Sequence, residues 1–156
     1  MGQVGFSVVG AVFLAALFVP NLVWARWAKP AGYDPGGEPL VLRLFERSGQ
    51  VLTTTAALVF ADTNPGPWSP WSAWLVAAVA LMVAYEACWV RYFTSRRTLS
   101  DFYRGALGVP VPLATLPVLA FLLLGVYGRL VPLVAATLVL GVGHIGIHLI
   151  GRRHAV

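Results

Sequence analysis

Charged residues are scarce in this chain, and their scarcity excludes a water-exposed domain. Only 11% of the 156 residues are charged, whereas 58% are apolar. Soluble domains carry about 25% charged residues. The mean hydropathy of +0.77 points the same way. A polar surface cannot be built from this composition, so the sequence predicts one integral membrane domain over residues 1–156.

Cysteine, lysine and the common catalytic motifs are also in short supply. The single cysteine, Cys88, excludes an internal disulfide, and its apolar surroundings predict a buried bystander. Ten of the eleven basic residues are Arg, which together with abundant Ala, Val, Leu and Gly is typical of a GC-rich bacterial genome. Neither Gly-x-Ser-x-Gly nor His-Glu-x-x-His occurs. The sequence therefore predicts no cofactor and leaves enzyme activity open.

Long apolar runs account for most of the chain. A membrane-spanning helix needs roughly 20 apolar residues, and such runs predict spans at residues 4–24, 40–61, 71–93, 109–127 and 130–150. Gly- and Pro-rich stretches predict a loop over 30–39 and a turn over 64–67. In the basic loop 94–108, Ser100 is expected to cap a short interfacial helix that begins at Asp101. The predicted fold is an all-α membrane bundle of about five transmembrane helices.

The positions of Arg and Lys predict the orientation of this bundle. Ten basic residues lie near one set of span ends, and only Arg129 lies near the other. Because Arg and Lys favour cytoplasmic loops, we expect the N-terminus outside and the C-terminus inside, in a bacterial inner (plasma) membrane. The net charge of +5 then reflects topology, and no nucleic-acid partner is expected. No basic residue precedes the first run, which favours a retained span over a signal peptide.

Ionisable and polar residues recur at one depth in three of the expected spans. At about 1.5 Å rise per residue, Glu46, Arg47, Glu86 and His144 each lie about 10 Å below the cytoplasmic interface. Such groups cost several kcal/mol when they face lipid, so we predict a polar, cytoplasm-facing pocket in which Glu86 pairs with His144. The candidates for ligand or proton binding are Glu86, His144, His148, Glu46, Arg47, Gln50 and Tyr85.

Simpler interpretations of these residues remain open. Long Arg side chains near a span end can extend to the headgroups, Glu46 can pair with a neighbouring Arg, and the two histidines can join helices by hydrogen bonds. His144 and His148 share a helix face at i and i+4, which makes them weak candidates for a metal site and argues against a bis-histidine haem. The glycines at 141, 143 and 146 predict close approach of a helix or a ligand.

A second group of candidates lies at the cytoplasmic surface. The basic, aromatic-rich loop indicates either topology and interface anchoring or recognition of an anionic headgroup or phosphate. Asp101 is expected to pair with Arg104 or with an Arg of the second span. The headgroup or anion candidates are Arg43, Arg96, Arg97, Asp101 and Arg104.

Three functions remain compatible with these patterns. The leading one is a proton- or ion-linked carrier or binding protein for a small or anionic ligand; five spans are few for a transporter, so this reading implies a homo-oligomer. The second is an enzyme that acts from the cytoplasmic leaflet on a lipid-linked or phosphate-bearing substrate, with Glu86 or His144 as acid or base. The third is a non-catalytic accessory subunit. Membrane lipid is the expected partner in every case.

Overall fold

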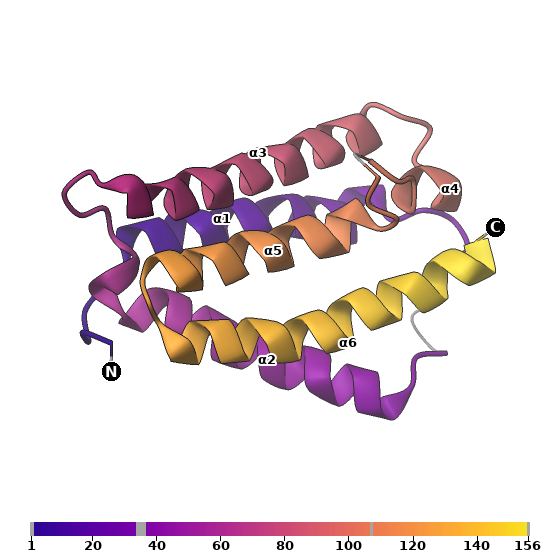
Figure 1. Ribbon diagram of the computed structural model, residues 1–156. Helices are drawn as coiled ribbons and strands as arrows, with labels where there is room; N and C mark the ends of the chain where they lie inside the picture. Colours follow the sequence, from indigo (N-terminus) through magenta and orange to yellow (C-terminus); the bar gives the residue numbers. More distant parts are fainter. Residues whose placement is uncertain (1, 34–36, 107, 156) are drawn as a thin grey trace.

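The chain folds into a bundle of helices, shown in Figure 1 as a computed structural model that describes residues 2–33, 37–106 and 108–155. Within these residues it is all-α. The helices are α1 (Val8–Val23), α2 (Leu40–Val59), α3 (Ala73–Phe93), α4 (Leu99–Phe102), α5 (Pro112–Tyr127) and α6 (Val131–Ala155). Part of the loop expected over 30–39, namely residues 34–36, lies outside the described residues.

The five long helices run alternately up and down the bundle (Figure 1). We call the two ends the N-terminal end, with the chain start and the α2–α3 and α5–α6 connections, and the C-terminal end, with the α1–α2 connection, α4 and the chain end. α2 packs mainly on α6, and α5 lies between α6 and α3. α1 adjoins α2 on one side and α3 on the other.

Three helical segments are long and apolar enough to cross a membrane, and they indicate a multi-pass membrane protein. They are Val8–Ala28, Pro70–Phe93 and Val131–Arg153. α5 is apolar but has only 16 residues, which is about 24 Å at the rise of an α-helix. α2 has 20 residues, but its first half is charged. Of the five expected spans, length and composition therefore support three, and the other two are helices of the same bundle.

The first helix starts later than the apolar run because a serine caps it. Ser7 Oγ accepts a hydrogen bond of 2.7 Å from the Gly10 amide. The Ser7 hydroxyl also lies 2.6 Å from that of Thr63, and Asn64 Oδ1 accepts the Val8 amide at 2.8 Å. The chain before α1 is thereby tied to the segment after α2, and the span expected from residue 4 begins at Val8.

Three further helix boundaries differ from the expected ones. The short helix α4 begins at Leu99, with Thr98 rather than Ser100 as its cap, because Thr98 Oγ1 accepts the Asp101 amide at 3.1 Å. α5 begins at Pro112, since proline fits the first turn of a helix. α6 continues to Ala155, beyond the expected end at 150.

Glycines allow α2 and α6 to pack with their backbones in contact. A methyl group at Gly49 would overlap the backbone of Leu140, and one at Gly143 would overlap the backbone of Leu42 and Glu46. The close helix approach predicted beside the histidines is thus confirmed, with α2 as the neighbour. Gly10 similarly lies against the Ala57 carbonyl, so α1 meets α2 near the N-terminal end of the bundle.

Candidate functional site

A carboxylate and an imidazole meet where α2 and α6 cross. His144 Nδ1 lies 2.6 Å from Glu46 Oε1, a distance that requires one shared proton. The His144 and Glu46 side chains are only 22% and 15% exposed. Gly143 lies directly beside this contact and lets the two backbones approach. The crossing therefore fixes a largely enclosed acid–base pair.

The partner of His144 is Glu46, and the pairing expected with Glu86 was wrong. Helix rise gives the depth of a residue along a span but not the direction that it faces. Glu86 is on α3, and α5 lies between α3 and α6. The Glu86 Oε1 atom is enclosed and has no hydrogen-bond partner among the described residues. Glu86 is consequently separate from the pair.

Next to the pair lies a cavity of about 200 Å³ among α1, α2, α5 and α6. His144 forms part of its wall, while none of its described lining residues comes from α3. The polar lining residues are Asn21, Gln50, Thr53, Thr54 and His144; the others are apolar, among them Leu14, Phe18, Phe121 and Leu140. The pocket predicted among spans two, three and five thus has α1 and α5 as walls in place of α3.

Thr53 is the most deeply buried polar residue of this cavity. Its side chain is 2% exposed, and its Oγ1 has no hydrogen-bond partner among the described residues. Buried hydroxyl groups are normally hydrogen bonded. Thr53 was not among the sequence candidates, because a threonine within an apolar helix has no distinctive spacing.

Asn21 is held in the cavity wall by two hydrogen bonds. Its Nδ2 donates to the Leu17 carbonyl and to the Tyr85 hydroxyl, both at 2.7 Å. Tyr85, a sequence candidate, therefore supports the wall from behind and does not itself line the cavity. Asn21 was not among the candidates, although an asparagine directly after Pro20 in an apolar run was a signal for it.

Two residues that line the cavity, one on α1 and one on α2, are also exposed. They are Phe18, which is 45% exposed, and Gln50. α1 and α2 are in backbone contact at Gly10 and Ala57, nearer the N-terminal end. The cavity residues of α1 lie farther along the chain, from Leu14 to Asn21, beyond this contact.

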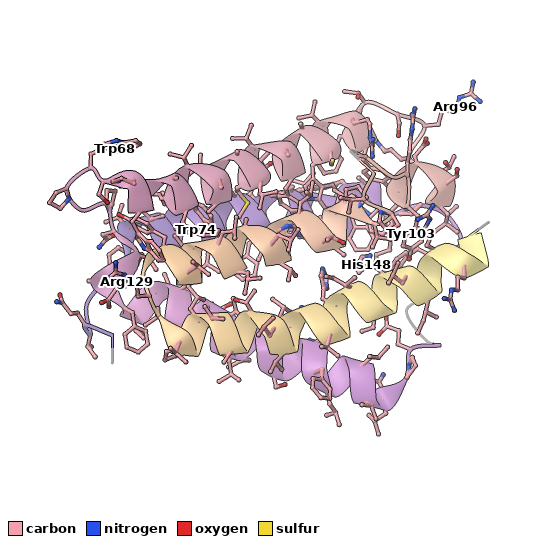
Figure 2. All side chains as sticks on the ribbon, viewed as in Figure 1. Trp68, Trp74, Arg96, Tyr103, Arg129 and His148 are labelled. Carbon is pink, nitrogen blue, oxygen red and sulfur yellow. The ribbon has the colours of Figure 1, made fainter. Side chains whose placement is uncertain are left out.

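From the pair, a row of titratable rings leads toward the C-terminal end. The His144 and His148 rings are 4.6 Å apart between centroids, and His148 and Tyr103 are 6.1 Å apart. Figure 2 shows Tyr103 and His148 side by side between α4 and α6. The Tyr103 hydroxyl lies against Gly151 of α6.

The charged groups of α2 interact electrostatically with Glu38, which lies just before this helix. Burial and the Glu46 carboxylate raise the pKa of Glu38, while Arg43, Arg47 and His144 act to lower it. Arg43 and Arg47 are themselves exposed. These groups therefore form one electrostatic cluster at the C-terminal end of the bundle.

The arginines of the basic loop that were candidates are exposed, and none of the described residues of this loop lines the cavity. Arg96 extends from the end of the bundle in Figure 2, Arg97 Nε donates to the Phe93 carbonyl at 3.3 Å, and Arg104 is exposed. Asp101 was expected to pair with an arginine. Instead it accepts the Thr98 amide at 3.1 Å and the Thr98 hydroxyl at 2.9 Å.

The capping role of Asp101 predicts a local effect of pH. Hydrogen bonds from the Thr98 amide and hydroxyl lower the pKa of Asp101 below its ordinary value of 3.8. Because the folded-state pKa is the lower one, the cap stabilises α4 above the unfolded-state value and is lost as pH falls through the folded-state value. At neutral pH, Asp101→Ala should lower the hydrogen-exchange protection of the Phe102 amide, which donates to the Thr98 carbonyl.

The matched control for this measurement is Ser100→Ala, a change to the exposed neighbouring residue. It should leave Phe102 protection at the wild-type level. Equal protection in all three proteins would show that the carboxylate does not hold α4.

No three His, Cys, Asp or Glu residues of the described chain are grouped closely enough to hold a metal ion. A scan against protein-family models and searches of curated proteins and of solved structures found no match to this chain.

Proposed function

We propose that this chain is a five-span inner-membrane protein that binds or carries a small, anionic ligand in a proton-linked manner. Its ligand site is the cavity beside the Glu46–His144 pair, open toward the cytoplasmic side. The observation that carries the proposal is the pair itself: a hydrogen-bonded imidazole and carboxylate, 2.6 Å apart, at the wall of a partly polar cavity. An imidazole and a carboxylate can each take up and release a proton, so such a pair is suited to proton exchange.

The arrangement of the helices supports a five-span topology. The long helices alternate in direction, which brings ten of the eleven basic residues to the C-terminal end or its adjoining turns. The remaining one, Arg129, lies at the N-terminal end over the ring of Trp71, at 4.9 Å from its centroid. By the charge rule the C-terminal end faces the cytoplasm. The charged half of α2 is then close enough to that interface for its arginines to reach water.

The row of rings supports a proton connection to the cytoplasm. His148 and Tyr103 continue from His144 toward the C-terminal end. Both can donate and accept hydrogen bonds. They thus offer intermediate positions between the pair and the cytoplasmic surface. Five spans are few for a carrier, so the proposal includes a homo-oligomer.

Single-cysteine labelling tests both the topology and the opening of the cavity. In a Cys88→Ala background, a membrane-impermeant thiol reagent should label Gly66→Cys only from the periplasm and Arg96→Cys only from the cytoplasm. Gln50→Cys, in the cavity wall, should also react from the cytoplasmic side. Its matched control is Val83→Cys: Gln50 is ten residues from the first residue of α2, and Val83 is ten from the last residue of α3.

Val83 is exposed on the outside of the bundle and lines no part of the cavity, so lipid should protect it. Labelling of positions 66 and 96 from the same side would contradict the five-span topology. Equal, slow labelling of positions 50 and 83 would contradict a cavity that water reaches from the cytoplasm.

A further inference from the structure

We propose that the ligand of this cavity is a carboxylate with a short or medium apolar tail, bound with its carboxylate at Thr53, Gln50 and His144. This inference rests on the proposed function and specifies its ligand class. It follows from three properties of the cavity: an unpartnered buried hydroxyl, a set of hydrogen-bonding groups close to exposed cations, and a small apolar remainder.

The Thr53 hydroxyl needs a hydrogen-bond partner that the described residues do not supply. It is almost fully buried and lines the cavity without a hydrogen-bond partner among the described residues. A purely hydrocarbon ligand would leave it unpaired, at an energetic cost. A ligand oxygen within the cavity satisfies it.

The surrounding groups favour an anionic oxygen over a neutral or cationic group. The Gln50 amide and the Thr54 hydroxyl can donate, and His144 becomes a cationic donor when it is protonated against Glu46. Arg47 precedes Gln50 by three residues, and Arg43 precedes Arg47 by four, so both arginines lie on the same stripe of α2. They are exposed and attract an anion toward this part of α2.

The rest of the cavity limits the size and nature of the ligand. Leu14, Leu17, Phe18, Val118, Phe121 and Leu140 provide an apolar lining. A volume of about 200 Å³ is below the roughly 300–1,000 Å³ of sites for drug-sized ligands. It suits one short chain and excludes a two-chain phospholipid.

Equilibrium binding of isotope-labelled octanoate to the full chain in lipid nanodiscs tests this assignment. Empty nanodiscs provide the baseline for partitioning into lipid, and 1-octanol is the matched ligand without a carboxylate. Wild type should bind octanoate saturably and more tightly than octanol. Thr53→Val keeps the shape of the side chain and removes the hydroxyl, so it should weaken octanoate binding about tenfold or more.

Thr137→Val is the matched control, because Thr137 is an equally buried threonine whose hydroxyl donates to the Leu133 carbonyl, outside the cavity. It should bind octanoate as wild type does. The inference is overturned if octanoate shows no saturable binding above empty nanodiscs, if octanol binds equally well, or if both threonine variants bind alike. Labelling of Gln50→Cys is read separately, so a cavity open to the cytoplasm that rejects octanoate refutes the ligand class and not the proposed site.

Discussion

Replacing Gly143 by alanine should destabilise the protein by about 2–3 kcal/mol, the upper range for overpacking a close-packed interior. The added methyl group would overlap the backbone of Leu42 and Glu46 on α2. Alanine is favoured over glycine in a helix by about 1 kcal/mol, but backbone atoms cannot rotate away as a side chain does. The clash should therefore exceed the gain in helix propensity, separate α2 from α6 and disturb the Glu46–His144 contact.

The free energy of unfolding, measured by SDS titration in mixed micelles, checks this expectation. Gly66→Ala is the matched control, since a methyl group at Gly66 would meet no atom within 4 Å. Its stability should be close to that of wild type. A Gly143→Ala protein as stable as the Gly66→Ala protein would show that α2 and α6 are not in backbone contact.

A double-mutant cycle between Glu46 and His144 should give a coupling energy of about 1–2 kcal/mol. Removing one member of a fully buried ion pair costs about 3–5 kcal/mol. Here the two side chains are 15% and 22% exposed, so solvent screens part of the interaction. The cycle compares Glu46→Ala, His144→Ala and the double variant by the same unfolding titration.

The control is a second double-mutant cycle, between Glu86 and His144. Because Glu86 has no contact with His144 among the described residues, Glu86→Ala and His144→Ala should act additively. Coupling of His144 to Glu86 that equals or exceeds its coupling to Glu46 would contradict the arrangement of the site.

The helices could be predicted from the sequence because apolar runs and turn residues are local signals. Every expected span has a helix in the structure, and the first helix starts later than expected because Ser7 caps it. Crossing a membrane depends on length and polarity, and these support three of the segments; α2 is too polar and α5 too short. The five-span topology is for that reason a proposal.

The site could be predicted only in part, because helical spacing defines a face but not its neighbour. The stripe on α2 and the histidines on α6 do meet. Glu86 matched them in depth, yet nothing in one sequence shows that α5 separates α3 from α6. Asn21 and Thr53 line one cavity because α1, α2, α5 and α6 pack around it, and the sequence alone does not show this packing.

Nitrogen-15 NMR of histidine-labelled protein in nanodiscs tests the hydrogen bond between Glu46 and His144. The His144 signals are assigned by their loss in His144→Asn. Glu46→Gln should shift the His144 Nδ1 signal, because it replaces the carboxylate that lies 2.6 Å from this nitrogen, whereas Glu86→Gln should leave the signal in place. A His144 signal that responds to Glu86→Gln and not to Glu46→Gln would show that Glu46 is not the partner of His144.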